Sequence, residues 1–194
     1  MDNEKVRKLR TLILPDSARA SKGIGKGGYD RRNSSAKFSL TVWPEIKKYF
    51  NRNSTVLDVG CGNGRFSNFI SRHAKEVRAI DGYVEIDKSN QAPNINFSVE
   101  KLEDFFSGRK YDVVFLYGVF YLFPFPKNID IFGKLIDFLA PDGVLIIIEN
   151  TSCDKTLYDL QAYSDAFGAS IEAMFDTCIE ESWEHKTTVI KKAK

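Results

Sequence analysis

A glycine-rich turn with an acidic residue directly before it is the part of the chain best suited to bind a ligand. The run is Val56-Leu57-Asp58-Val59-Gly60-Cys61-Gly62-Asn63-Gly64-Arg65-Phe66. Glycine adopts positive φ without steric penalty and lets the backbone approach a ligand closely. Apolar residues 55–59 predict a short strand and residues 65–73 a helix. The turn therefore lies at the carboxyl end of a strand, where open α/β sheets bind their ligands.

A second carboxylate, Asp81, ends the next predicted strand, 21 residues after Gly60. An acidic residue at that spacing can accept hydrogen bonds from both hydroxyls of a ribose. The plainer alternative is that Asp81 only caps the segment that follows it. Together with the glycine turn, the position of Asp81 indicates an adenosine-type ligand.

The spacing of the glycines separates two cofactor classes that use this layout. A nicotinamide or flavin dinucleotide fold needs G-x-G-x-x-G, in which the third glycine permits tight helix packing beside the pyrophosphate. Here the spacing is G-x-G-x-G, and Arg65 occupies that third position. Asp58 would also repel a pyrophosphate, whereas it suits the methionyl ammonium of S-adenosylmethionine. The residues therefore favour S-adenosylmethionine over a dinucleotide.

Residues 56–64 resemble the first motif of the class I S-adenosylmethionine-dependent methyltransferases, a superfamily with a Rossmann-like fold. Weaker resemblance extends over about residues 54–150. It includes the ribose-binding second motif at 79–82, the third strand and adenine loop at 97–105, the fourth strand at 111–117, and the turn and fifth strand at 139–147.

The resemblance implies a role for each matching position. The backbone at Gly60 and Gly62 would border the cofactor, Asp81 would hold the ribose, and the N–H of Leu102 would contact adenine N1. Lys101 stands where the family often has an acidic residue for the adenine amino group, and Glu103 is the nearby substitute. The full predicted set of cofactor-binding residues is Asp58, Gly60, Cys61, Gly62, Asp81, Gly82, Leu102, Glu103 and Tyr117.

Strands and helices alternate beyond residue 54, which predicts an α/β fold with a mostly parallel, doubly wound sheet. We expect seven strands, helices on both faces and an antiparallel last strand. The expected strands are 55–59, 77–80, 95–99, 111–117, 144–148, 171–180 and 184–191. The expected helices are 38–51, with Leu40 on its apolar side, 65–73, 128–139 and 155–167. A turn is expected at 141–143.

Length and composition predict one globular domain, because the chain has 194 residues, 43% hydrophobic and 28% charged. It contains no apolar run of the roughly 18 residues that span a bilayer, and no signal-peptide core. A cytoplasmic location is therefore expected. Three cysteines and two histidines, none at ligand spacing, predict neither a metal site nor a disulfide framework.

Charge is distributed unevenly along the chain. Residues 1–53 contain 13 Lys/Arg and 5 Asp/Glu, a net charge of +8, whereas residues 54–194 carry −6. We interpret 1–53 as a basic arm and helix that can close over the active site as a lid, and 54–194 as the methyltransferase domain. A solvated tail is the alternative for the arm. Its charge also fits the phosphates of a nucleic acid.

The sequence indicates the methyl acceptor less clearly than the cofactor, because methyl transfer depends mainly on positioning the nucleophile. Candidate residues follow the predicted fourth and fifth strands or lie in the arm. The weak catalytic candidates are Tyr29, Tyr121 and Asp154. The other candidates that follow these two strands are Tyr117, Glu149 and Asn150. Residues 118–126 lack the Asn-Pro-Pro-Tyr signature of DNA-base methylation, and their aromatic residues favour an apolar pocket. His185 is expected on an exposed late strand, and His73 at a helix end.

Three functions remain open from the sequence. A small-molecule oxygen or nitrogen methyltransferase is favoured by the compact chain and the aromatic segment. The alternatives are an RNA or other nucleic-acid methyltransferase that uses the basic arm, and a non-catalytic S-adenosylmethionine-binding subunit. The oligomeric state is not predicted.

Overall fold

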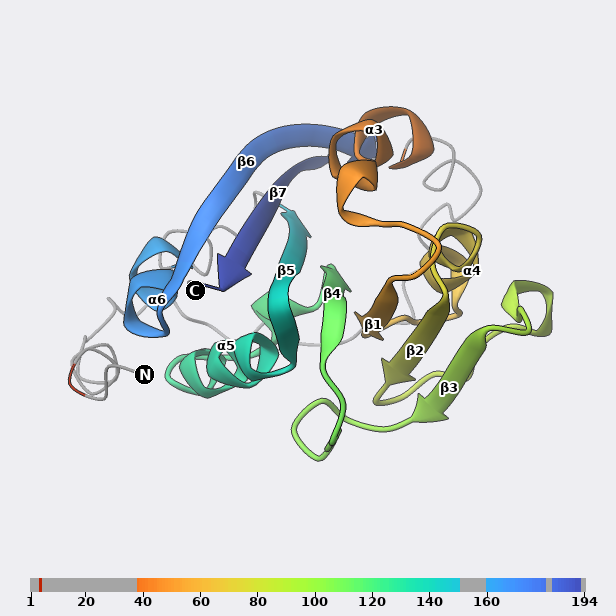
Figure 1. Cartoon of the computed structure of the whole chain (residues 1–194), viewed down its shortest axis with the longest axis horizontal. Helices are drawn as coiled ribbons and strands as arrows, with labels where there is room; N and C mark the ends of the chain where they lie inside the picture. Colours follow the sequence, from red (N-terminus) through yellow and green to blue (C-terminus); the bar gives the residue numbers. More distant parts are fainter. Residues whose placement is uncertain (1–3, 5–37, 151–159, 181–182, 193–194) are drawn as a thin grey trace.

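A single seven-stranded sheet organises the computed structural model, which describes residue 4 and residues 38–150, 160–180 and 183–192 (Figure 1). The strand order is β3-β2-β1-β4-β5-β7-β6. The pairs among β1 to β5 are parallel, and β7 runs antiparallel to both β5 and β6. The predicted doubly wound α/β fold with an antiparallel last strand is confirmed. The strands are β1 (Thr55–Val59), β2 (Glu76–Asp81), β3 (Ile95–Val99), β4 (Tyr111–Tyr117), β5 (Leu139–Asn150), β6 (Ala169–Glu180) and β7 (Trp183–Lys192).

Both faces of the sheet are covered, which is why β4 and β5 are apolar almost throughout. Successive residues of β4 point to opposite faces, so Phe115 packs on one face and Leu116 on the other. One apolar layer contains residues of α5 (Lys127–Asp137) and α6 (Leu160–Ala166). The other contains residues of α3 (Trp43–Ile46) and α4 (Arg65–Ser71).

Residues 38–50 form part of the second layer. Phe38, Val42 and Ile46 are fully buried there, and the Phe38 ring centroid lies 4.7 Å from that of Phe66 in α4. The expected helix 38–51 is interrupted, with α3 followed by the 3-10 turn η1 (Lys47–Tyr49). Placing Leu40 on the apolar side was wrong, because its side chain is 76% exposed. The buried spacing of i, i+4, i+8 begins two residues earlier, at Phe38.

The predicted turn at 141–143 is instead an irregularity inside β5. Tyr111 pairs with Leu139 and Val113 with Val144, so β5 carries extra residues opposite β4. Asp142 has φ 64°, and a Cβ on Gly143 would lie 2.8 Å from the carbonyl oxygen of Tyr111. The backbone at this bulge therefore needs glycine at position 143 for close packing.

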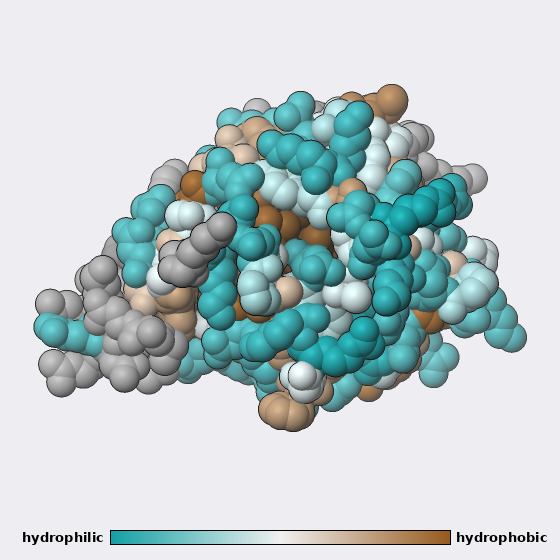
Figure 2. All heavy atoms as spheres, in the orientation of Figure 1, coloured by the Kyte–Doolittle hydropathy of each residue, from teal (hydrophilic) through white to brown (hydrophobic). Residues whose placement is uncertain are grey.

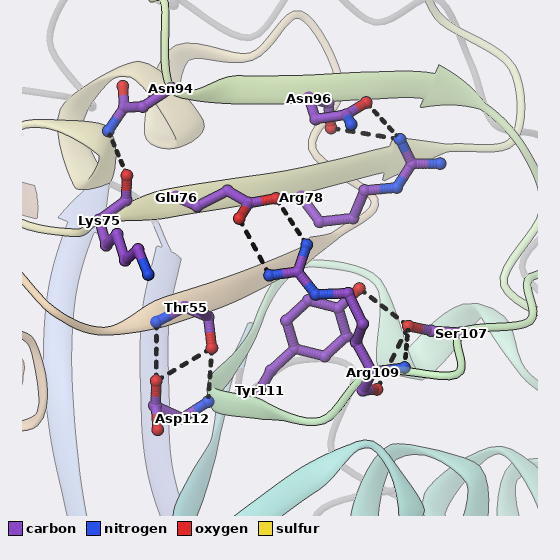
Figure 3. A network of polar contacts seen from close by, with 10 residues as sticks. All are labelled: Thr55, Lys75, Glu76, Arg78, Asn94, Asn96, Ser107, Arg109, Tyr111 and Asp112. Atoms are coloured by element: carbon purple, nitrogen blue, oxygen red, sulfur yellow. Dashed lines mark hydrogen bonds and ion pairs between the residues drawn. The ribbon is translucent and has the colours of Figure 1, made fainter.

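Polar side chains fix the amino ends of the strands. Arg109 donates two hydrogen bonds to the Glu76 carboxylate, at 2.9 and 3.0 Å, and Asp112 accepts from the N–H and hydroxyl of Thr55 (Figure 3). These contacts join β1, β2 and the start of β4. The amino ends of these three strands are thus held together by side-chain hydrogen bonds.

Among the described residues, no helix is long and apolar enough to cross a membrane, and no group of three His, Cys, Asp or Glu side chains is arranged to hold a metal ion. The face seen in Figure 2 is mostly hydrophilic. It is hollowed near its centre, and more hydrophobic residues lie in the hollow.

Candidate functional site

Three alternate glycines shape the turn between β1 and α4. Gly60, Gly62 and Gly64 have φ values of 70°, 55° and 83°, in the region that residues with a Cβ rarely adopt. The N–H groups of Gly60 and Cys61 both donate to the carbonyl oxygen of Ile80, at 2.8 and 3.0 Å. These two hydrogen bonds therefore fix the first residues of the turn to the end of β2.

The surroundings of the three glycines differ. A Cβ on Gly60 would come within 2.2 Å of Val119, and one on Gly64 within 2.0 Å of Ile86. At Gly62 the same atom would meet none of the described residues within 4 Å. Packing explains the glycines at 60 and 64, whereas the open space at Gly62 leaves backbone that a ligand can approach closely.

Asp81 binds the turn and the segment after β2 at the same time. Its Oδ2 accepts a hydrogen bond from the N–H of Gly62 at 2.9 Å, and its Oδ1 accepts from the N–H groups of Tyr83 and Val84. Asp81 therefore does cap the segment after β2, which was the plainer alternative for this residue. Because a carboxylate has about four acceptor sites, the partly exposed Asp81 retains capacity for another donor, and its contact with a ribose stays a prediction.

Asp58 lies under the turn, buried against α4. Its Oδ2 accepts a hydrogen bond from the Ser67 hydroxyl at 2.5 Å, and its side chain is almost fully buried. Burial raises the pKa of Asp58 to about 7; the Ser67 bond opposes this rise and the charge of Asp81 adds to it. A cation bound above the turn would favour the ionised carboxylate.

The thiol of Cys61 is buried beside the same two carboxylates. Burial raises the pKa of Cys61 well above its usual range, and the negative charges of Asp58 and Asp81 add to the effect. A thiol held in its protonated form is a poor nucleophile. The position of Cys61 therefore fits a wall of the turn and not a reactive group.

The predicted adenine-side residues lie together beyond β2 and β3. Gly82 is close to Lys101, since a Cβ added to Gly82 would lie 3.0 Å from the Lys101 Cγ. The Leu102 side chain is in the core, which leaves its backbone for the predicted contact. The Glu103 carboxylate accepts a hydrogen bond from Lys127 of α5 at 2.6 Å. To contact adenine as predicted, the Glu103 carboxylate would have to bind the adenine amino group and Lys127 at the same time.

Tyr117 at the end of β4 meets a residue that the sequence did not assign to the site. The Tyr117 hydroxyl lies 3.3 Å from His185 Nε2, and the two rings stack at 18° with centroids 5.6 Å apart. The Tyr117 ring also packs against Phe66 in α4, with ring centroids 4.8 Å apart. The expectation that His185 is exposed was wrong, because its side chain is only 4% exposed.

Strand topology explains why His185 was missed. β7 is antiparallel, so its first residues lie beside the carboxyl end of β5, where His185 pairs with Asn150 in register. If residues 184–191 are taken as the outermost strand of the sheet, this histidine is expected to be exposed to solvent. In the structure β7 lies between β5 and β6. The buried Thr187, two residues further along the same face, has a hydroxyl with no hydrogen-bond partner among the described residues.

Of the three weak catalytic candidates, Tyr121 alone lies among the described residues. Tyr29 and Asp154 lie outside the described residues, and Tyr121 is half-buried in the 3-10 turn η3 (Phe120–Leu122). Phe120 and Phe123 are buried in the apolar core that contains residues of α5. The aromatic segment therefore serves packing at these two positions.

Comparison with known proteins bears on the same segments. A family model described as "Methyltransferase domain" matches residues 30–176. Malonyl-[acyl-carrier protein] O-methyltransferase 1 of Ilyobacter polytropus is 26% identical over 164 residues, which are 77% of this chain and 58% of that protein. The chain thus spans less than two thirds of the length of this relative.

Solved structures share the fold. The N-methyltransferase NodS of Bradyrhizobium japonicum WM9, in complex with S-adenosyl-L-homocysteine, superimposes with a TM-score of 0.65 at 13% identity, over 98% of this chain and 99% of its own. The 1,6-didemethyltoxoflavin-N1-methyltransferase of Burkholderia thailandensis gives 0.64 at 16% identity, over 84% and 78%. At these identities the structures establish the fold alone.

Proposed function

Since the methyltransferase-domain model matches most of its length, the chain belongs to the class I S-adenosylmethionine-dependent methyltransferases, and we propose that it methylates an oxygen or nitrogen of a small-molecule acceptor. The observation that carries the proposal is the turn at Gly60–Gly64, which offers open backbone at Gly62 between the carboxylates of Asp58 and Asp81.

The residues at this turn fit S-adenosylmethionine. None of the described residues fills the space where a Gly62 Cβ would lie, so the cofactor can contact the backbone directly. Asp81 retains acceptor capacity for hydroxyl donors. Asp58 places negative charge under the turn, which favours an ammonium and disfavours a pyrophosphate.

When bound, S-adenosylmethionine supplies an electrophilic methyl group on a sulfonium. The chain's own residues then have three tasks in our proposal: the glycine turn and Asp58 hold the amino-acid end, Asp81 holds the ribose, and the end of β4 orients the acceptor. Holding the reacting atoms about 3–3.5 Å apart and in line contributes much of the rate.

We place the acceptor beside Tyr117 and His185. Their 3.3 Å contact lies at the carboxyl end of β4. The Tyr117 ring also packs against Phe66 of α4, the helix that begins at the glycine turn. An imidazole can take the proton that an oxygen or nitrogen nucleophile loses as it is methylated. The Tyr117 hydroxyl would hold the ring in the required orientation.

The B. thailandensis structure contains 1,6-didemethyltoxoflavin, which supports a small acceptor, and the N-methyltransferase NodS supports a nitrogen acceptor. Residues 38–50 pack in the second apolar layer, so our proposed lid is the part of the basic arm that precedes them. The cytoplasm stays our proposed location. The +8 charge of residues 1–53 favours a second candidate, methylation of a nucleic acid. That function predicts acceptor binding that weakens steeply with salt.

The test begins with the cofactor and proceeds to the acceptor. Calorimetry should detect binding of S-adenosylmethionine and S-adenosylhomocysteine but not of a nicotinamide dinucleotide. The protein is then incubated with methyl-labelled S-adenosylmethionine and separate small-molecule, RNA and protein fractions of an extract, and the labelled product is identified by mass. Label in the small-molecule fraction at all salt concentrations is the expected result.

Other outcomes overturn parts of the proposal. Label only in RNA, lost as salt rises, establishes the second candidate. Cofactor binding with no S-adenosylhomocysteine formed in any fraction indicates a non-catalytic binding subunit. Binding of the dinucleotide but not of S-adenosylmethionine refutes the cofactor assignment.

A further inference from the structure

A carboxyl group is buried at the end of β5, where the apolar strand would otherwise continue. Glu149 is fully buried, on the face of β5 that carries Leu145 and Ile147. Burial of a carboxyl group is unfavourable unless its oxygens are hydrogen-bonded. Burial raises the pKa of Glu149 to about 8, although backbone N–H donors at Phe120, Val119 and Tyr121 oppose the rise.

One oxygen of this carboxyl holds the backbone that leaves β4. Oε1 accepts hydrogen bonds from the N–H of Val119 at 3.1 Å and from the N–H of Phe120 at 2.6 Å. The other oxygen, Oε2, is buried without a hydrogen-bond partner among the described residues. Gly118 turns the chain with φ 64°, and its N–H donates to the carbonyl of Ile148. Residues 118–120 are therefore fixed from β5.

The segment held in this way touches the glycine turn. The Val119 side chain packs so closely on Gly60 that a Cβ there would come within 2.2 Å of one Val119 methyl and 3.1 Å of the other. Gly60 is itself bonded through its N–H to Ile80. A continuous set of contacts thus runs from Glu149 through Val119 to the turn, although Glu149 lies two strands away from β1.

We propose that Glu149 is a positioning residue for the cofactor pocket: its Oε1 fixes the backbone of Val119, so that the Val119 side chain forms the wall against Gly60. This inference rests on the proposed cofactor site at the glycine turn. It assigns Glu149 a function as a hydrogen-bond acceptor at that wall and not as a base that reaches the reacting atoms.

The role as an acceptor distinguishes two substitutions of similar size. Glu149→Gln keeps an oxygen that can accept from both N–H groups, whereas Glu149→Met fills the space without a strong acceptor. We expect Glu149→Gln to bind S-adenosylhomocysteine within about threefold of the wild-type affinity and Glu149→Met to bind about tenfold more weakly or worse. Calorimetry on the folded full-length chain gives both dissociation constants.

A second readout follows the loop itself. Hydrogen exchange of the Val119 and Phe120 amides, measured without ligand, should become faster in Glu149→Met and stay near the wild-type rate in Glu149→Gln. Leu135→Ala in the same core layer is the control for general destabilisation, since Leu135 is fully buried in α5. It should lower the melting temperature and leave the affinity unchanged.

The outcomes separate this inference from the proposed function. Wild-type protein that does not bind S-adenosylhomocysteine overturns the proposed function. Wild-type binding together with an unchanged affinity in Glu149→Met, or an equal loss in Glu149→Gln, overturns the positioning role alone. Should Glu149→Met fail to fold, Val119→Ala decides: it must weaken binding while its own amide stays protected.

Discussion

Adding a methyl group at Gly62 tests the cofactor site most directly. Gly62 has φ 55°, and no atom of the described part of the chain lies within 4 Å of the Cβ that Gly62→Ala would introduce. The effect on folding is therefore limited to the left-handed backbone, which costs a residue with a Cβ about 1–2 kcal/mol. For a chain of this size that corresponds to a fall in melting temperature of about 2–8 °C.

The effect on binding should be larger than the effect on folding explains. If S-adenosylhomocysteine contacts the Gly62 backbone, the added methyl occupies the space of the ligand, and we expect a loss of affinity of about tenfold or more. Calorimetric titration at a temperature where the variant is folded measures this loss, and differential scanning calorimetry measures the stability change.

Gly168 provides a matched control. It lies between α6 and β6 and has φ 63°, and an added Cβ would likewise meet no described residue within 4 Å. Gly168→Ala should show the same fall in melting temperature and no change in affinity. If the folded Gly62→Ala protein binds S-adenosylhomocysteine as tightly as the wild type, the proposed cofactor position is refuted.

Three further substitutions test the remaining groups. Asp81→Ala should weaken S-adenosylhomocysteine binding by on the order of 1–3 kcal/mol through loss of a charged acceptor, and unchanged calorimetry would exclude the ribose role. An ammonium bound near Asp58 favours its ionised form, so the affinity of the wild type for S-adenosylhomocysteine should fall as pH drops below about 7. Asp58→Asn should bind the ligand weakly and without this pH dependence. If the affinity of the variant still falls with pH, another group is responsible. His185→Gln should slow methylation of the identified acceptor without changing S-adenosylhomocysteine affinity, whereas His73→Gln, at the only other histidine, should not slow it.

The sequence by itself determined the fold class and the cofactor turn. Strand and helix alternation is a local pattern, and an apolar strand, three alternate glycines and a following helix lie within 11 consecutive residues, Val56–Phe66. Asp81 is also accessible to sequence reasoning, because the length of one strand–helix–strand unit sets its distance from Gly60. Such features depend on neighbours in the chain, so their spacing is sufficient to predict them.

Only the tertiary structure brings together the distant residues of the proposed site. His185 reaches Tyr117, 68 residues earlier, because the antiparallel β7 begins beside the end of β5. Glu149 reaches the glycine turn only through Val119. These contacts depend on strand order and direction across the sheet. No periodicity along the chain encodes such distances. Burial, which also depends on the tertiary structure, raises the pKa of the Glu149 carboxyl above its usual value.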